Sequence, residues 1–346
     1  MIKPCFKSAV CVFLLACIVS PIHGGSFYSS KGIGLVRYFT SGRAAGMGGV
    51  GLSFGDNLTV NYLNPATLVD LSLTTINGNF LHESADLKSL SQDANITDSN
   101  IFGVQFAIPL KQNRITMALG VNPYSTVDFS FLNSEPTRTE TVSGDGGVNT
   151  AFFSLAVRPF DKLSLGVTGL FYFGVLRNIY RVDFVDPEFF DTRDEVAQSF
   201  TAGNVRFGIV FEILPDWNIG GVFSPSVTLD ANKTVTLRGV AKFSDFADRD
   251  LEIPLAFGGG TSIEFAKKLL FGVDFYLQKW SEFGIDGLVN NSVRIGAGIE
   301  YSARGDQRDS FFSRTAYRAG IFYRDLGIEE PMGEEVTELF GSVGLG

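Results

Sequence analysis

A strict alternation of apolar residues with polar or small ones is the feature that most restricts how this chain can fold. From about residue 71 onward it recurs in one segment after another. Leu163, Leu165 and Val167, for example, alternate with Ser164 and Gly166. Successive side chains of a β-strand point to opposite faces, so each such segment predicts a strand with one apolar face. The same pattern runs through 205–213, 271–278 and 293–301.

The lengths of the predicted strands and of their connections favour a membrane barrel over a soluble β-sandwich. The strands commonly have about 10 to 13 residues, whereas strands of soluble proteins usually have about 5 or 6. A tilted barrel strand needs about 9–11 residues to cross a membrane. Short turns also alternate with long polar loops, as the periplasmic turns and external loops of an up-and-down barrel do. The short turns lie near 111–113, 159–162, 214–216 and 266–268, and the long loops near 83–99, 123–146, 176–197, 225–250, 279–290 and 325–335. The exception is 303–313, a longer link where a short turn is expected.

The predicted fold class is therefore all-β: a transmembrane, antiparallel, up-and-down β-barrel. About twelve strands are expected, and the sequence stops at Gly346 within a strand-like stretch. A barrel has to close, because an open edge leaves unpaired backbone groups in lipid. We therefore expect the chain to be truncated and to lack a final hairpin. The strands are expected near 72–82, 100–110, 114–122, 147–158, 163–175, 198–213, 216–224, 251–265, 269–279, 292–302, 315–324 and 336–346.

The first 24 residues have the layout of a secretory signal peptide. Lys3 and Lys7 supply the positive start, an uncharged run covers 8–20, and cleavage is expected after Gly24. All three cysteines lie in this leader, so the mature chain would contain no disulfide. The formal net charge is −9, and removal of the leader lysines makes it more negative. An acidic chain of this kind argues against nucleic-acid binding, which is built on basic surface.

Little in the mature sequence supports an enzyme. Its single histidine, His82, lies where the first strand enters a long loop, and no serine motif accompanies it. Residues 46–51 match the pattern G-x-G-x-x-G, but a dinucleotide site needs a strand before that pattern and a helix after it. Asn64 and Pro65 break any helix downstream. We therefore expect no catalytic residue, no metal and no cofactor.

The glycine-rich segment before the first strand resembles the plug region of the FadL/TodX-type outer-membrane transporters. The resemblance rests on an ordered set: small residues with one arginine, a Met-Gly-Gly core, an acidic residue, and then Asn-Pro-Ala. These features fall within 41–51, at position 56 and within 61–66. The residues of this hatch motif are Gly42, Arg43, Gly46, Met47, Gly48, Gly49, Gly51, Asp56, Asn64, Pro65 and Ala66.

The resemblance implies a 14-stranded barrel whose lumen is filled by an N-terminal hatch. The domains would then be the signal peptide (1–24), the hatch (25–70) and the barrel (71–346), the last without its final hairpin. Irregular backbone is tolerated at membrane depth only where protein or water surrounds it. Glycines permit close backbone approach, so a glycine-rich segment suits a lumen.

Aromatic residues of the long loops are candidates for binding a hydrophobic ligand at the outer surface. The alternative is that these loops pack on one another or simply extend the strands. Phe27 and Tyr28 join the candidates from the resemblance alone, because they lie near the mature N-terminus. The full set is Phe27, Tyr28, Phe129, Phe131, Phe184, Phe189 and Phe190.

Charged residues occupy the lumen side of several predicted strands. They would either hold the hatch by ion pairs or bind the carboxylate head group of a ligand. Polar lumens are normal in such barrels, which favours the structural role. These residues are Arg206, Glu212, Asp274, Arg294, Glu300 and Arg318.

The predicted function is an outer-membrane channel for uptake of hydrophobic small molecules, either fatty-acid-like or aromatic, by passive hatch-gated diffusion. The predicted partners are membrane lipid and a hydrophobic small-molecule ligand, with no nucleic acid, and the chain is expected to be a monomer. The alternative is a structural or secretion-associated outer-membrane barrel that binds a protein partner through its external loops. A soluble periplasmic β-protein is a third possibility.

Overall fold

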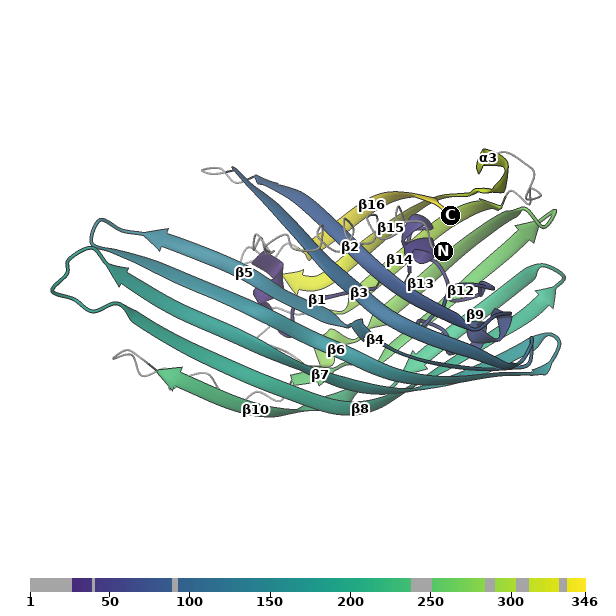
Figure 1. The fold of residues 1–346 in the computed structure, drawn as a ribbon, viewed down its shortest axis with the longest axis horizontal. Helices are drawn as coiled ribbons and strands as arrows, with labels where there is room; N and C mark the ends of the chain where they lie inside the picture. The colour runs from purple at the N-terminus through teal and green to yellow at the C-terminus, as the bar shows by residue number, and fades with distance from the viewer. Residues whose placement is uncertain are drawn as a thin grey trace, which may run out of the picture.

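The computed structural model describes residues 27–38, 41–88, 93–237, 251–283, 290–302, 311–329 and 335–346 (Figure 1). The signal peptide predicted for 1–24 lies outside the described residues. Long antiparallel strands dominate, and the helical segments are single turns or little more. None of the helices in this part of the chain has the length and apolar character that a membrane span requires.

Twelve strands follow one another in the sheet, in the order β16-β15-β14-β13-β12-β9-β8-β7-β6-β4-β3-β2. Every neighbouring pair is antiparallel. The predicted order of an up-and-down sheet is therefore confirmed. The strands are β2 (Thr75–Lys88), β3 (Asp93–Lys111), β4 (Ile115–Pro123), β6 (Arg138–Phe160), β7 (Leu163–Phe184), β8 (Thr192–Leu214), β9 (Trp217–Ser224), β12 (Ala256–Phe265), β13 (Leu269–Gln278), β14 (Ser292–Ser302), β15 (Ala316–Glu329) and β16 (Glu335–Leu345).

Four further strands pair beside this path. They are β1 (Leu35–Val36), β5 (Ser125–Ser134), β10 (Val227–Leu237) and β11 (Leu251–Ile253). β5 continues the line of β4 along β6, and β10 lies along the first half of β8, where β9 pairs with the second half. β1 belongs to the hatch segment and pairs with the free side of β5. The sheet and the hatch are therefore joined by main-chain hydrogen bonds.

The apolar side of the strands is the exposed side, and the polar side is buried. Phe171 and Phe207 are about half exposed, at 51% and 49%, whereas Arg206 and Asp274 on the other face are 4% and 2% exposed. A soluble sandwich would show the reverse arrangement, because its apolar face forms the core. The predicted sidedness, with apolar residues exposed on one face and polar residues buried on the other, is confirmed.

Four strands are far longer than predicted, because the segments expected to be long loops are largely strand extensions. β6 and β8 have 23 residues each, β7 has 22 and β3 has 19, and the longest extend for about 75 Å at roughly 3.3 Å per residue. Loops were expected at 83–99, 123–146 and 176–197, and that prediction was wrong, since the described residues of 83–99 pair as β2 and β3. β10 likewise occupies part of the loop predicted for 225–250. Polar residues can continue these strands because each extension is held by main-chain hydrogen bonds to a neighbouring extension and does not depend on packing against an apolar core.

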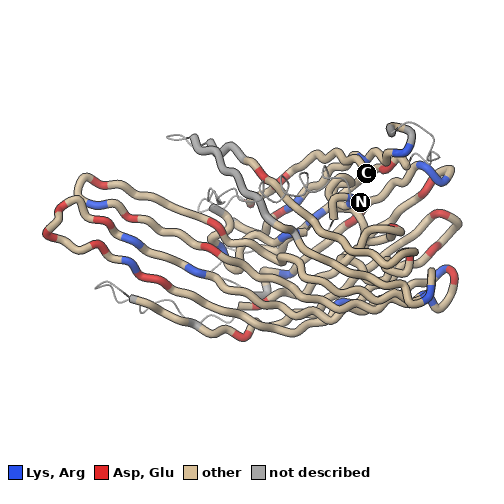
Figure 2. Tube along the Cα trace, in the orientation of Figure 1, with Lys and Arg blue, Asp and Glu red and all other residues tan. Residues whose placement is uncertain are grey.

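We call this extension the hairpin wing and define it as residues 127–146, 176–199 and 230–237. In Figure 1 the β5–β6 and β7–β8 hairpins reach beyond the ends of the other strands. The exposed face of β7 is apolar up to Val175, and then carries Arg177 and Arg181, which are about half exposed. Figure 2 shows basic and acidic residues interspersed along the wing. The wing therefore lies beyond the apolar band that contacts lipid.

The opposite end of the sheet has the short turns that the sequence predicted. Asn113 and Asp216 have positive φ angles of 55° and 66°, and Ala266 and Lys267 have 50° and 54°. Such angles are typical of the tight turns that join antiparallel strands. Within the described residues, β2 and β16 each pair on one side, so they form the two edges of the sheet. A closed wall of fourteen strands stays a prediction.

Candidate functional site

The hatch segment lies against the inward face of the sheet and fills the space that we call the lumen. Its elements are η1 (Phe27–Ser30), β1, α2 (Gly42–Gly46) and η2 (Pro65–Asp70). Ser41 caps α2 by accepting a hydrogen bond from the Ala44 amide at 3.1 Å. Gly48 and Gly49 follow with positive φ angles of 66° and 75°, a conformation that favours glycine. The Met-Gly-Gly core of the motif is therefore the turn that reverses the hatch after α2.

Glycines of the wall let the hatch backbone approach several strands. A Cβ atom on Gly320 or Gly298 would lie closer than 3.0 Å to the backbone of Met47, and one on Gly320 also to that of Gly48. A Cβ on Gly220 would meet the backbone of Leu52 in the same way. Real Cβ atoms do not make such contacts, so these positions have no room for a side chain. Glycine on the lumen side therefore sets how tightly the hatch is held.

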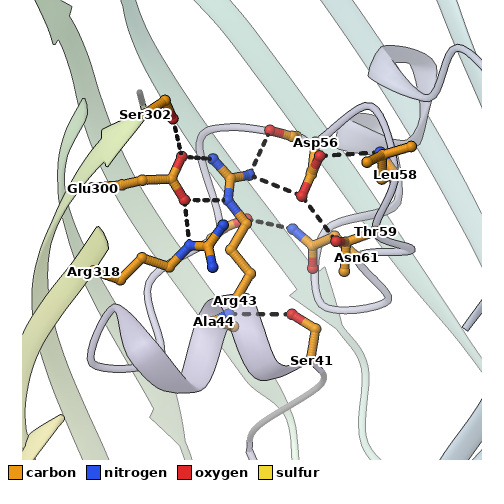
Figure 3. Close-up of polar contacts among 12 residues, drawn as sticks. Ser41, Arg43, Ala44, Asp56, Leu58, Thr59, Asn61, Glu300, Ser302 and Arg318 are labelled. Atoms are coloured by element: carbon orange, nitrogen blue, oxygen red, sulfur yellow. Dashed lines mark hydrogen bonds and ion pairs between the residues drawn. The ribbon is translucent and has the colours of Figure 1, made fainter. Parts of the chain in front are cut away.

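A buried ion-pair network joins α2 to β14 and β15 (Figure 3). Arg43 donates from Nε and Nη2 to the two carboxylate oxygens of Glu300, both at 2.8 Å. Arg318 donates to Oε2 of Glu300 at 2.5 Å. Arg43 also donates to the Gly55 carbonyl at 2.9 Å and lies 3.7 Å from a carboxylate oxygen of Asp56. One carboxylate of the wall therefore binds the hatch arginine and a wall arginine together.

Asp274 of β13 anchors the irregular part of the hatch between α2 and η2. Its Oδ2 accepts hydrogen bonds from the amides of Gly51 at 2.7 Å and Leu52 at 2.9 Å. Asn64 makes the corresponding link further along, donating to the carbonyls of Leu52 at 2.5 Å and Ile209 at 3.1 Å. The same side chain accepts from the Ala66 amide and so caps η2. The Asn-Pro-Ala part of the motif thus fastens the hatch to itself and to β8.

Two buried arginines of the wall also contact hatch carbonyls. Arg206 donates to the Tyr62 carbonyl, and Arg294 donates to the Gly49 carbonyl, both at 3.2 Å. Together with Asp274, Glu300 and Arg318, five of the six predicted lumen charges are therefore near or in contact with the hatch. Their contacts favour hatch attachment over the alternative of binding a ligand's head group. Glu212, the sixth, lines a cavity at the short-turn end.

A layer of buried tyrosines crosses the lumen, and sequence reasoning did not find it. The Tyr38 hydroxyl donates to Gln278 at 2.6 Å, and Gln278 donates to the Tyr124 hydroxyl at 2.9 Å. The ring centroids of Tyr124 and Tyr172 lie 5.2 Å apart in an edge-to-face arrangement. The Arg294 guanidinium stacks over the Tyr38 ring at 5.2 Å. The only sequence signal was a tyrosine at inward positions of the alternation, such as 172 and 276.

A polar cavity of about 750 Å³ lies beside the hatch at the short-turn end and is lined by charged side chains, including Arg43, Asp56, Arg158, Glu212 and Glu300. Removing these groups from water would be unfavourable, so the cavity suits water better than an apolar solute. It does not have the apolar walls that a site for a fatty-acid-like molecule needs.

The predicted ligand-binding aromatics do not form one pocket. Phe129 is buried at 6% exposure and stacks on Phe131 within β5. Phe184 contacts Phe189 at the far end of the β7–β8 hairpin, where Phe190 is 91% exposed. Tyr28 and Phe27 lie in η1, which contacts β5; the side chain of Phe27 lies outside the described atoms. The set is therefore divided between the base and the tip of the hairpin wing.

Comparison with protein families gives one match that covers the whole chain. A family model with the description BamG matches residues 1–346. No curated protein matches the chain.

Comparison with solved structures finds proteins of the same architecture at low identity. A Pseudomonas aeruginosa FadL homologue is 13% identical, with a TM-score of 0.59 over 90% of this chain and 86% of that one. The Pseudomonas putida toluene transporter TodX is 13% identical, with a TM-score of 0.58 over 89% of each chain. The Ralstonia pickettii toluene transporter TbuX is 15% identical, with a TM-score of 0.52 over 88% of each chain. At these identities the likeness shows the fold alone.

Proposed function

Because the chain belongs to the BamG family, we propose that it serves in the outer membrane as a protein-binding partner of the BAM complex. The family match over residues 1–346 is the observation that carries this proposal. It favours the alternative of a structural or secretion-associated barrel that binds a protein partner through its external loops. The outer membrane is the location that both the family and the barrel-like fold indicate.

The prediction of membership in the FadL/TodX transporter family was wrong, and with it the prediction of a channel for hydrophobic compounds. The full-length match to BamG overturns both. What this chain shares with those transporters is the fold, at 12–15% identity. The hatch motif misled because its residues serve attachment: Gly48 turns the hatch, Arg43 holds it and Asn64 caps it. Those tasks are the same whatever a barrel of this fold does.

The lumen supports a role other than passage of a solute. Ion pairs and hydrogen bonds from β8, β13, β14 and β15 hold the hatch, and the tyrosine layer packs beside it. Each buried group that is moved away from its partner would lose hydrogen bonds worth about 0.5–3 kcal/mol. Moving the whole hatch would break many of these at once. A fixed hatch suits a scaffold.

The proposal places the molecule across the membrane with the hairpin wing outside the cell. Barrels of the outer membrane have short periplasmic turns and long external connections. The exposed apolar stretch of β7, from Leu163 to Val175, is long enough to cross the hydrocarbon. Lipid cannot satisfy the backbone of an edge strand, so the proposal also takes the free edges of β2 and β16 to be paired within the membrane. The wing is then free to meet a protein.

Affinity purification from the native membrane tests the function. A tagged chain expressed at its natural level is expected to enrich BAM-complex proteins roughly tenfold or more over an equally tagged, unrelated outer-membrane barrel. Quantitative mass spectrometry of the detergent eluates gives the ratio. Recovery equal to that of the control barrel would refute the proposal.

A flux measurement with the purified chain in liposomes tests the same proposal by asking whether the chain transports hydrophobic solutes. Uptake of a fatty acid or of toluene is expected to match that of protein-free liposomes, because the hatch is fixed and the open cavity is polar. Saturable uptake well above the protein-free rate would contradict this expectation.

A further inference from the structure

The turn that joins β7 to β8 exposes large apolar side chains at the outermost point of the hairpin wing. Phe190 is 91% exposed, Val185 70% and Phe189 60%. These residues lie beyond Arg177 and Arg181, where the lipid-facing band of β7 has ended. Lipid therefore does not explain their exposure, in contrast to the apolar residues of the band. Apolar groups gathered in this way outside a membrane usually mark a protein-binding surface.

The tip is held in one conformation rather than being a loose loop. Asp191 accepts a hydrogen bond from the Phe184 amide at 2.9 Å, across the neck of the turn. Asp186 accepts from the amides of Glu188 at 3.0 Å and Phe189 at 3.1 Å, through its side chain and its carbonyl respectively. The rings of Phe184 and Phe189 lie 5.5 Å apart. Presenting these apolar groups to a partner would therefore cost little conformational entropy.

The neighbouring hairpin supports the tip. The Val185 amide donates to the Thr137 carbonyl at 3.0 Å, in the turn between β5 and β6. The β5–β6 and β7–β8 hairpins thus end together, and each limits the movement of the other.

The surroundings of the exposed aromatics are acidic. Asp183, Asp186, Glu188 and Asp191 lie within nine residues, and no lysine or arginine lies between Arg181 and Arg193. Only Asp183 of the four has an ion pair within the described residues, to Arg181 at 2.7 Å. Such a surface repels nucleic acid and anionic lipid, and it attracts a basic surface.

We propose that residues 185–190, as an apolar tip ringed by carboxylates, dock into an apolar hollow with a basic rim on a protein of the BAM complex. The proposal rests on the proposed function and names the part of the chain that makes the contact. Aromatic residues, including phenylalanine, are enriched at the cores of interfaces, where a few residues carry most of the binding energy, and the surrounding charges set orientation and rate.

Replacement of Phe190 by serine tests the aromatic part. The change removes the most exposed ring and leaves the Phe184–Phe189 contact and the aspartate hydrogen bonds in place. Co-purified BAM-complex protein is expected to fall roughly tenfold, as for a residue that dominates an interface. Leu132→Ser is the matched control, because Leu132 is 69% exposed on the adjacent β5 and lies outside the tip. That variant should co-purify its partners as the wild type does.

Glu188→Lys tests the charged part. Reversing one tip carboxylate is expected to lower the recovery of BAM-complex protein about as strongly as Phe190→Ser does at low salt. At high salt the loss should be smaller, because salt screens exposed charges. Heat-modifiable migration on gels and trypsin resistance should match the wild type for all three variants, which shows that the sheet is intact.

The possible results separate the two proposals. If the wild type enriches no BAM-complex protein, both fall. If the wild type enriches BAM-complex protein and Phe190→Ser recovers it to within twofold of the wild type, the tip proposal alone is overturned. The same holds if Leu132→Ser loses as much BAM-complex protein as Phe190→Ser does. If Phe190→Ser instead abolishes self-association measured by light scattering, with BAM-complex recovery unchanged, the occupant is a second copy and the proposal is again overturned.

Discussion

Replacing Gly320 with leucine is expected to force the hatch turn out of its place in the lumen. A Cβ atom at this position would lie closer than 3.0 Å to backbone atoms of Met47 and Gly48. Backbone atoms cannot turn aside as a side chain can, so either the turn or β15 has to shift. Overpacking usually costs about 1–3 kcal/mol, and we expect this substitution to cost the upper part of that range or more.

Trypsin reports the displacement directly. Arg43 directly follows the start of α2, its side chain is 15% exposed, and Glu300 binds it, so the folded hatch should resist cleavage there. In Gly320→Leu we expect rapid cleavage after Arg43, detected by mass spectrometry, together with a lower temperature of unfolding in detergent.

Gly203→Leu is the matched control for Gly320→Leu. Gly203 lies on β8, on the lipid-facing side, and a Cβ atom there would meet no atom within 4 Å. The control should keep the trypsin resistance and the unfolding temperature of the wild type. If Gly320→Leu behaves in the same way as this control, close backbone approach does not hold the hatch.

Glu300→Gln is expected to lower the free energy of unfolding by about 3–5 kcal/mol, the range found when one partner of a buried ion pair is removed. The Glu300 side chain is 6% exposed and receives hydrogen bonds from both Arg43 and Arg318. Glutamine keeps the size of the side chain but removes its charge. Two arginines would then face each other with Asp56, 3.7 Å from Arg43, as the nearest remaining carboxylate in the network.

The measurement is denaturant unfolding of the purified chain in detergent, followed by heat-modifiable gel migration. Glu212→Gln is a suitable control, because Glu212 lines the same cavity and has no ion pair within the described residues. That control should change stability by less than about 1 kcal/mol. An additional Arg43→Met should recover part of the loss in Glu300→Gln, because it removes one unpaired charge. A loss in Glu300→Gln no larger than in the control would show that the network does not hold the hatch.

The sidedness of the sheet could be read from the sequence, since it depends on a local rule. Alternate residues of a strand point to opposite faces, so Leu165 and Val167 had to share one face whatever lay beside them. Strand length then indicated lipid on that face. The tight turns at Asn113 and Asp216 were equally local, because few residues adopt a positive φ.

The hairpin wing could not be read in this way. Arg177, Arg181 and Asp183 interrupt the apolar face of β7, and the alternation that identifies a strand disappears with it. These residues form a strand because β6 and β8 supply hydrogen-bond partners on both sides. That support comes from residues distant in the sequence, so the segment looked like a loop.

The presence of the hatch could be predicted from the sequence, but its contacts with the wall could not. Its glycines and its Asn-Pro pair stand out in the sequence, whereas the glycines that receive it, such as Gly298 and Gly320, look like any small residue in an alternating strand. The tyrosine layer was missed for the same reason. Tyr38 and Gln278 are separated by 240 positions, and only the packing of the hatch against the sheet brings them within a hydrogen bond.

The sequence alone determined which face of each strand meets lipid, where the tight turns fall, and that a glycine-rich segment precedes the wall. Each of these follows from a residue and its near neighbours in the chain. Only the tertiary structure decided which wall residues hold the hatch, how far the wing extends, and which aromatics end in the lumen and which at the tip. Those features depend on strand pairing and on close backbone contacts. Both are interactions between segments that are far apart in the chain, so no local pattern in the sequence records them.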